Sequence, residues 1–287
     1  MKPRPKSVVL DILSTLRGHS APVRLLVAAA EVFGIDSNAT RVAITRLLSC
    51  GLIERDERGA YRTGAAAAPI LHRLNSWRRI ETRTREWDGT WIGAAPDVSG
   101  NSKDTRTVGT RALEFTGMRE FSPGLWIRPN NLDGGLAAAR EALLALRLTQ
   151  DCPVFTLRDF DAVGEARARA LWDAAAIRSQ YRGLSGDLER SSAQLLQMDE
   201  RRAMAESFLL GGEAIRRIVL DPLLPDAIVP TAERDNLVHA MMAYDEVGRR
   251  CWAGFLSRFG VHASESPMDR QVWREAVSGA DVAPAAA

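Results

Sequence analysis

The stretch SNATRVAITRLLSCGLIERDERGAYRT, residues 37–63, decides the fold of the N-terminal part of this chain. It predicts a helix capped by Ser37 or Asn38, because a short side-chain oxygen there accepts a hydrogen bond from a free backbone N–H of the first turn. Gly51 is well placed to end the helix, since glycine tolerates the left-handed conformation found at that position. A short hairpin over residues 52–62 is predicted to follow.

The predicted helix has one apolar and one polar face. The apolar side chains recur at the spacings of three and four that are typical of a helix packed on a core, and they are Ala43, Ile44, Leu47 and Leu48. A capped helix followed by an arginine-bearing hairpin is the second half of a winged helix-turn-helix. That unit inserts its helix into the major groove of DNA and places the wing on the flanking backbone.

The polar side chains of this stretch define a candidate DNA interface. The helix residues expected to face base edges are Asn38, Arg41, Thr45 and Arg46. Arginine can bond guanine bidentately, and asparagine can do the same with adenine. The hairpin residues expected to hold phosphates are Arg55, Arg58 and Arg62. The competing interpretation is a solvated polar face followed by an ordinary hairpin, which gives part of the same pattern.

The flanking sequence favours DNA binding. Residues 6–17 and 23–33 each predict a helix, and Pro22 occupies a favourable first-turn position for the second. Residues 1–85 carry 15 Lys+Arg against 7 Asp+Glu, a balance of +8 that leaves −6 for the rest of a chain whose total is +2. A basic third on an acidic remainder is expected of a phosphate-binding module on a body that does not bind DNA. We predict a winged-helix domain over residues 1–66.

The composition is that of a soluble protein with several domains. The 287 residues predict two or three domains, and 46% hydrophobic with 26% charged residues suits sizeable cores. No apolar run approaches the ~20 residues of a membrane span, and we expect no signal segment. Three distant cysteines and four scattered histidines give no metal-ligand spacing. We therefore expect a cytoplasmic protein without metal or cofactor.

Beyond residue 66 the sequence changes character. Residues 67–85 predict a basic linker helix. Residues 86–162 alternate strands and helices in the order β-α-β-α-β, which favours a small sandwich of ferredoxin-like type. Residues 163–277 are helical, and residues 278–287, rich in Gly, Ala and Pro, are expected to form a disordered tail. The predicted fold class is α+β and mainly helical.

Several helices are predicted within the C-terminal region, over residues 166–181, 186–197, 200–210 and 233–259. Gly211-Gly212 is expected to break a helix. Pro222 is expected to end another, because proline cannot donate the required N–H.

Taken in order, several motifs resemble the PaaX family, bacterial repressors of phenylacetate catabolism. The resemblance runs from about residue 20 to residue 260. Its marks are RVAITRLLSCGLI at 41–53, WDGTWI at 87–92, GMREFSPGLWIRP at 117–129, ALWD at 170–173 with Tyr181 eight residues on, and LDPLLP at 220–225. The motif at 117–129 is the most specific. Each short motif alone is weak, but their common order is hard to produce by chance.

The resemblance implies an N-terminal winged helix, a central ferredoxin-like (Cas2-like) domain and a helical C-terminal domain. It also implies a homodimer that binds a palindromic operator in double-stranded DNA and represses an aromatic-compound (phenylacetate-like) catabolic operon. An aryl-CoA thioester such as phenylacetyl-CoA would release it. Such a ligand needs cations for its phosphates and an apolar slot for its acyl group. The central-domain candidates are Trp87, Trp91, Arg106, Arg111, Arg119, Trp126 and Arg128. The competing interpretation places the tryptophans in the core.

Other functions stay open. A metal-dependent, nucleic-acid-cleaving enzyme of Cas2-like type would need clustered carboxylates, but Asp88 stands alone and more simply closes a turn with Gly89. We therefore predict that the chain is not an enzyme. A scaffold could pair two chains through the helix at 233–259, although its apolar stripe could equally pack within its own domain: Leu237, Met241, Tyr244, Val247 and Cys251. A PaaX-like regulator of another pathway, with another effector, is the remaining alternative.

Overall fold

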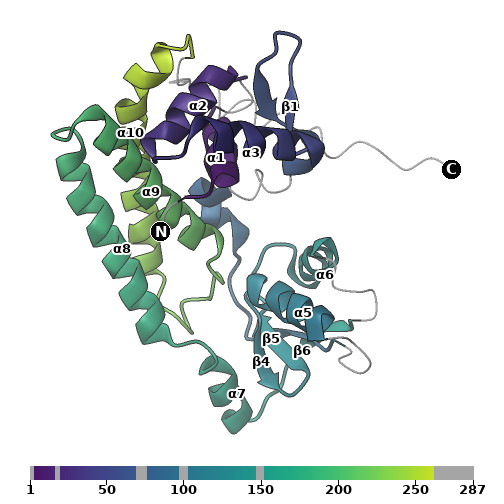
Figure 1. The fold of residues 1–287 in the computed structure, drawn as a ribbon. Coiled ribbons are helices and arrows are strands. Elements are labelled where there is room, and N and C mark those ends of the chain that lie inside the picture. Colours follow the sequence, from purple (N-terminus) through teal and green to yellow (C-terminus); the bar gives the residue numbers. More distant parts are fainter. Residues whose placement is uncertain (1–2, 17–19, 69–75, 97–102, 147–151, 262–287) are drawn as a thin grey trace. The chain divides into compact units, whose positions relative to one another are not determined.

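The computed structural model describes residues 3–16, 20–68, 76–96, 103–146 and 152–261 (Figure 1). It does not describe the side chains of residues 76, 79, 81 and 103–108. The predicted tail at 278–287, part of the predicted linker helix and the side chain of Arg106 therefore lie outside the described residues. The chain divides into two compact units: an N-terminal unit, Met1–Ala67 with Trp252–Ala287, and a main unit, Ala68–Cys251.

The N-terminal unit begins with two helices, α1 (Pro5–Thr15) and α2 (Val23–Val32), which confirm the helices predicted there. Pro5 lies in the first turn of α1, where the missing N–H has no helical partner to lose. The apolar stripes of both helices are buried and form much of the core of this unit, with Val9, Leu13, Leu25 and Leu26 fully covered.

Helix α3 (Ser37–Ser49) is the predicted third helix, but its cap differs from the prediction. Asp36 caps it, and the Asp36 Oδ1 atom accepts from the backbone N–H of Ala39 at 2.8 Å. Ser37 is instead the first helical residue. Gly51 ends this segment as predicted, with φ of +67° and its N–H donated to the carbonyl of Leu48 at 3.0 Å.

The hairpin pairs β1 (Ile53–Arg55) with β2 (Tyr61–Thr63) in antiparallel register. Ala21, which precedes α2, pairs with Tyr61 through two backbone hydrogen bonds of 2.7 and 2.8 Å. The hairpin is thus fastened to the start of α2. A short 3-10 helix, η1 (Ala65–Ala67), ends this part of the chain.

The last turns of α10 (Ala232–Ser257) belong to the N-terminal unit. Trp252 stacks on Phe33 at a centroid distance of 6.4 Å, and the Arg24 guanidinium lies 5.9 Å from the ring centroid of Phe259. The prediction had placed residues 163–277 together in one helical domain. The difference arises because these aromatic contacts join segments that are more than 200 residues apart in the chain.

The main unit contains a four-stranded sheet whose strands are ordered β4-β5-β3-β6, with every adjacent pair antiparallel. Its elements in chain order are β3 (Trp91–Ala94), α5 (Lys103–Phe115), β4 (Arg119–Ser122), β5 (Leu125–Pro129), α6 (Gly135–Ala145) and β6 (Val154–Leu157). The order is therefore β-α-β-β-α-β. The predicted β-α-β-α-β pattern missed β4, because this short edge strand begins with charged residues, which is common at sheet edges.

Each face of this sheet is covered by different elements. Helices α5 and α6 pack on one face over a core that includes Ile92, Leu113 and Leu143 (Figure 1). The other face packs on the helical part of the main unit. There Trp91 and Ile127 form a second hydrophobic cluster with residues that include Trp172. Successive residues of a strand point to opposite faces, so Trp91 and Ile92 of β3 belong to different clusters.

The helical part of the main unit is built from α7 (Ala162–Arg169), α8 (Ala174–Leu195), α9 (Glu200–Val219) and most of α10, which run side by side from α8 to α10 (Figure 1). The single helix predicted over 166–181 is wrong, because Asp173 caps a new helix by accepting from the N–H of Ala176 at 2.9 Å. The predicted break at Gly211-Gly212 is also wrong. Both glycines lie inside α9, and Gly211 allows close approach to Met241 and Tyr244 of α10.

The predicted linker helix is represented by η2 (Ser76–Arg83), a 3-10 helix whose Trp77 and Ile80 are buried in the core of α8, α9 and α10. The architecture as a whole is α+β, mainly helical, with small antiparallel sheets. None of the helices in the described ranges has the length and apolar character that a membrane crossing requires.

Candidate nucleic-acid interface and a buried polar network

The polar face of α3 is exposed. All four helix residues predicted to face DNA lie on this surface: Asn38, Arg41, Thr45 and Arg46. The opposite side of the helix is buried through Thr40, Ala43, Ile44 and Leu47. The structure therefore brings the four polar side chains together on one surface, as expected from their spacing.

These side chains are available to a ligand. Thr45 Oγ1 donates to the carbonyl of Arg41 at 3.1 Å, which leaves a hydroxyl lone pair facing solvent. The guanidinium groups of Arg41 and Arg46 form no hydrogen bond or ion pair with any described residue. Unpaired arginine forks on a rigid helix are suited to bidentate bonds with base edges or phosphates.

The three hairpin arginines are exposed but differ in their partners. Arg58 lies at the turn with no described partner for its guanidinium, whereas Arg55 Nε donates to the carbonyl of Gly59 at 3.3 Å. Arg62 pairs with Glu54 across the hairpin at 2.6 Å. An exposed ion pair of this kind contributes only about 0–1 kcal/mol, so a phosphate can compete for Arg62.

The hairpin turn is ordered by Asp56. Its Oδ1 atom accepts from the N–H of Ala60 at 2.8 Å and from the N–H of Arg58 at 3.0 Å. A hydrogen bond from the Ser20 side chain, followed by these backbone bonds, lowers the pKa of Asp56. The carboxylate therefore stays ionised at neutral pH and fixes the direction in which Arg58 leaves the turn.

The residues predicted to bind an aryl-CoA ligand do not converge on one site, as far as their side chains are described. Trp91 is buried on one face of the sheet against Trp172, with ring centroids 6.2 Å apart, while Trp126 lies in the core under α5 and α6 on the other face. Trp87 lies beside Trp91 and is covered by the Arg169 guanidinium at 4.9 Å. Arg111 is exposed, and Arg119 Nη1 donates to the carbonyl of Met118. The tryptophans at 91 and 126 are core residues.

The Arg128 side chain is only 2% exposed and forms its hydrogen bonds within the protein. Its Nη1 donates to the carbonyl of Thr116 at 2.5 Å, and its Nη2 donates to the carbonyl of Pro222 at 3.1 Å. Burial, and then the neighbouring Arg83 cation, lower the pKa of Arg128 to about 9, so it remains charged at neutral pH. Arg128 therefore joins the sheet to the segment that follows α9.

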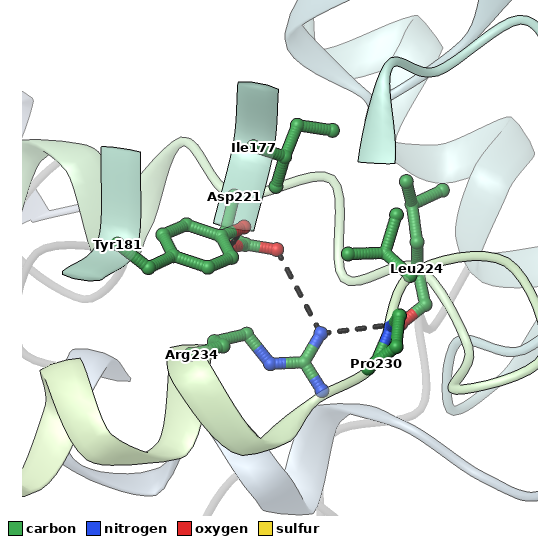
Figure 2. Close-up of a pocket in the computed structure, with 7 residues that line it drawn as sticks. Ile177, Tyr181, Asp221, Leu224, Pro230 and Arg234 are labelled. Carbon is green, nitrogen blue, oxygen red and sulfur yellow. Dashed lines mark hydrogen bonds and ion pairs between the residues drawn. The ribbon is translucent and has the colours of Figure 1, made fainter. Parts of the chain in front are cut away.

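That segment carries the buried carboxylate of Asp221, whose side chain is 1% exposed. Tyr181 of α8 donates its hydroxyl hydrogen to Asp221, and Arg234 of α10 lies 3.8 Å from the carboxylate (Figure 2). Burial raises the pKa of Asp221, and the Arg234 charge and the Tyr181 hydrogen bond oppose that rise. The Arg234 guanidinium also donates to the carbonyl of Leu224 at 3.2 Å.

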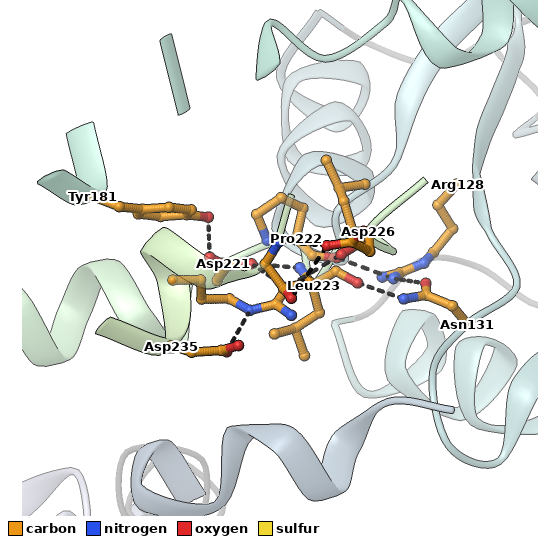
Figure 3. Close-up of polar contacts among 11 residues, drawn as sticks. Arg128, Asn131, Tyr181, Asp221, Pro222, Leu223, Asp226 and Asp235 are labelled. Carbon is orange, nitrogen blue, oxygen red and sulfur yellow. Dashed lines mark hydrogen bonds and ion pairs between the residues drawn. The ribbon is translucent and has the colours of Figure 1, made fainter. Parts of the chain in front are cut away.

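The same segment is bonded to the sheet on its other side. Asn131 Nδ2 donates to the carbonyl of Leu223 at 2.6 Å, next to the Arg128 bond to Pro222 (Figure 3). Leu223 has a positive φ of 52°, and the N–H of Leu223 donates to Asp221 Oδ1 at 2.6 Å. Side chains from the sheet, α8 and α10 thus hold residues 221–224 from several directions, which stabilises a backbone conformation that leucine rarely adopts.

The hollow around Asp221 is too tight to hold even a water molecule, since Tyr181, Leu224 and Arg234 close over it. The network therefore has a structural role, because it connects the sheet to the helices. We call the contacts of Arg128, Tyr181, Asp221 and Arg234 the joint around Asp221. Sequence reasoning did not assign Tyr181, Asp221 or Arg234 to any site, and it assigned Arg128 to a ligand site rather than to this network. The available signal was an aspartate inside the apolar run LDPLLP, because a buried carboxylate requires partners.

The alternatives to DNA binding gain no support from the described residues. Asp88 Oδ1 accepts from the N–H and the hydroxyl of Thr90 at 2.9 and 2.6 Å, so Asp88 closes a turn as expected. Among the described residues, no group of three or more His, Cys, Asp or Glu side chains is arranged to hold a metal ion. The stripe on α10 packs inside its own unit, with Leu237, Met241 and Tyr244 buried against α8 and α9.

Residues 172–247, which span α8, α9 and much of α10, match the family model described as the PaaX-like protein C-terminal domain. The chain carries a PaaX-like C-terminal domain. The resemblance to the PaaX family is confirmed by this match, which covers Tyr181 and Asp221. The motifs of that resemblance within the main unit lie close together, because Trp91, Arg128, Trp172 and Asp221 all lie at the junction of the sheet with the helices.

The chain also has a solved structural neighbour. It is similar to Uncharacterized protein Rv0674 from Mycobacterium tuberculosis, with a TM-score of 0.58 and 24% sequence identity over 85% of this chain and 97% of that one. At this identity the similarity concerns the fold alone. A comparison with curated proteins finds no match.

Proposed function

We propose that this chain is a DNA-binding transcriptional regulator of the PaaX type. The observation that carries the proposal is the surface of α3, where Asn38, Arg41, Thr45 and Arg46 are exposed together while the other face is buried. The hairpin arginines beside it supply further cations for the DNA backbone. A PaaX-like C-terminal domain supports a PaaX-family regulator in general.

We infer the domain types from the order of elements. Helices α1, α2 and α3 followed by the β1-β2 hairpin support a winged helix-turn-helix, with α3 as the helix that enters the major groove. The β-α-β-β-α-β order of the sheet, with neighbours β4-β5-β3-β6, supports a ferredoxin-like (Cas2-like) domain. In this proposal the domain contributes architecture, and none of its residues is assigned a catalytic role.

The finer regulatory role follows the family resemblance. We propose a homodimer that represses an aromatic-compound (phenylacetate-like) catabolic operon by binding a palindromic operator. The two recognition helices would then lie about 34 Å apart or a multiple of that distance, because successive major-groove sites repeat once per helical turn. We propose an aryl-CoA thioester such as phenylacetyl-CoA as the inducer. The network around Asp221 contains buried charges that a ligand could rearrange, but the effector itself rests on the resemblance.

Binding of the full chain to promoter fragments from its own genome tests the central claim. Fluorescence anisotropy at low ionic strength should detect a specific complex, whose affinity falls steeply as salt rises. Arg41→Ala should weaken it, whereas Arg190→Ala, at an exposed arginine of α8, should not. Failure to bind any fragment, or equal losses in both variants, would remove the proposal.

The effector is tested separately by thermal shift. Phenylacetyl-CoA at saturating concentration should raise the melting temperature, because a ligand that binds only the folded state stabilises it. Free CoA is the control for the acyl group. An unchanged melting temperature would reject this effector and leave DNA binding unaffected.

A further inference from the structure

Val42 is an apolar side chain in the middle of the polar face of α3, and it is 42% exposed. At 3.6 residues per turn, Asn38 and Arg46 lie about one turn before and after it, and Thr45 lies beside it. Helix α3 packs on the core through its opposite face, which includes Ile44 and Leu47. Val42 is therefore presented to whatever contacts the polar surface of α3.

A hollow of about 480 Å³ lies next to Val42, between α3 and the start of α1. Its apolar wall is formed by Ala39, Val42 and Ala43. Its cationic side chains are Arg4, Lys6 and Arg46, and none of the described residues that line it is acidic. Arg4 and Lys6 are exposed, and no described residue pairs with their charged groups. The hollow thus combines an apolar wall with unneutralised positive charge.

This combination is complementary to one strand of duplex DNA. The apolar feature of the major groove is the C5-methyl group of thymine, which small aliphatic side chains contact. The phosphates that flank each base are the natural partners of lysine and arginine. A purely apolar ligand would leave the cations unused, and an inorganic anion would leave the apolar wall bare.

We propose that Val42 contacts the methyl group of a thymine and that Arg4 and Lys6 hold a phosphate of the adjoining backbone. This inference rests on the proposed DNA-binding function and adds to it. It assigns sequence selection to a residue that makes no hydrogen bond, and it places the start of α1 on the DNA. The predicted interface had contained neither feature.

Deoxyuridine provides the test, because it differs from thymidine only by the missing methyl group. The probe is the tightest duplex recovered by selection from a random-sequence pool with the full chain. Each thymine is replaced singly by deoxyuridine, and the affinity of each duplex is measured by anisotropy. For the unmodified protein, we expect one position per half-site to lose about fourfold in affinity, which corresponds to one methyl group no longer buried.

Val42→Ala should bind the original duplex about as weakly as the unmodified protein binds that deoxyuridine duplex, and it should no longer respond to the replacement. Val42→Thr keeps the shape of the side chain with one methyl group fewer and serves as a second variant. Val163→Ala, at a valine of α7 that is 77% exposed, is the matched control and should keep the full response. Because alanine favours helices, Val42→Ala should melt at an unchanged temperature.

Arg4→Ala and Lys6→Ala should weaken binding to all duplexes equally and lower the salt dependence by about one phosphate contact each. If no deoxyuridine replacement changed the affinity of the unmodified protein, the inference would be overturned while DNA binding stood. The inference would also be overturned if Val42→Ala still lost affinity on the same deoxyuridine replacement. If the selection recovered no duplex at all, the proposed function would fail together with the inference.

Discussion

Replacing Tyr181 by phenylalanine removes one hydroxyl group from the joint around Asp221 and nothing else. Tyr181 is 5% exposed, and its ring packs in the core of α8, α9 and α10. Phenylalanine keeps that ring, so no cavity forms. The change therefore isolates one hydrogen bond, which the hydroxyl donates to a buried carboxylate.

Burial raises the pKa of Asp221, but the cations of Arg234 and Arg83 favour its ionised form. The expected loss is worked out for an ionised acceptor. A hydrogen bond to an ionised group contributes about 1.5–3 kcal/mol, against about 0.5–1.5 kcal/mol for a neutral pair. Asp221 keeps the N–H of Leu223 at 2.6 Å and Arg234 at 3.8 Å, so its carboxylate is not left without partners. We expect the free energy of unfolding to fall by about 2 kcal/mol. For a unit of this size the melting temperature would fall by about 4–8 °C.

Tyr244→Phe is the matched control. Tyr244 is 1% exposed in the same core, but its hydroxyl contacts the neutral hydroxyl of Ser191 at 2.9 Å. We expect it to lose about 1 kcal/mol. Urea unfolding of the full chain, followed by tryptophan fluorescence, measures both variants, because Trp77, Trp91 and Trp172 are buried in the main unit.

The pH dependence of the unfolding free energy supplies a second test of the charge of Asp221. Burial raises the pKa of Asp221 in the folded chain above that of the unfolded chain. This group's contribution to stability is therefore largest below the unfolded pKa and falls as pH rises through the folded pKa. In acid the carboxyl group is neutral, so the penalty of Tyr181→Phe should shrink towards that of Tyr244→Phe. Equal penalties at neutral pH, or a penalty that does not change with pH, would refute the assigned charge of Asp221.

Further predictions concern the DNA interface and the helical core. Arg41→Ala should cost about 1–3 kcal/mol on the selected DNA site and relax its base preference at one position, as measured by anisotropy with the four base pairs there. Glu54→Gln should strengthen DNA binding about two- to fivefold at low salt, because it frees Arg62 from a 2.6 Å ion pair. Gly211→Leu should destabilise the main unit by about 1–3 kcal/mol in urea, since an added Cβ would already lie 3.4 Å from Met241 and leave no room for the rest of the side chain. Gly212→Ala has no described neighbour within 4 Å and should stabilise the helix by about 0.5–1 kcal/mol.

Each of these has an outcome that contradicts it. Equal weakening of Arg41→Ala on all sequences would make Arg41 a phosphate contact. An unchanged affinity in Glu54→Gln would mean that Arg62 does not reach the DNA. If Gly211→Leu and Gly212→Ala had the same effect, the assigned packing of α9 on α10 would be wrong.

Local patterns predicted much of the N-terminal unit. The helices α1, α2 and α3, the stop at Gly51 and the hairpin all follow from short-range spacing, because caps, turns and amphipathic stripes are properties of neighbouring residues. The predicted cap of α3 differs from the observed one by one or two residues, since Asp36, Ser37 and Asn38 are all good caps and only the backbone geometry distinguishes them.

The errors in the main unit have a common origin. Strand β4 has too few apolar residues to be recognised, and it exists because β5 lies beside it. Gly211 has the low helix propensity of any glycine, but packing against α10 keeps it helical. Trp91 and Trp126 were considered for one ligand site, although the alternation of strand residues places them on opposite faces of the sheet.

The sequence by itself determined the exposed and buried faces of α3, the basic character of the N-terminal unit and the PaaX resemblance. These depend on residue type and on spacing within a few turns. Only the tertiary structure decided that Arg128, Tyr181, Asp221 and Arg234 form one joint, since they come from elements far apart in the chain. A buried charge can be tolerated only where folding brings its partners to it, and no local pattern specifies those partners.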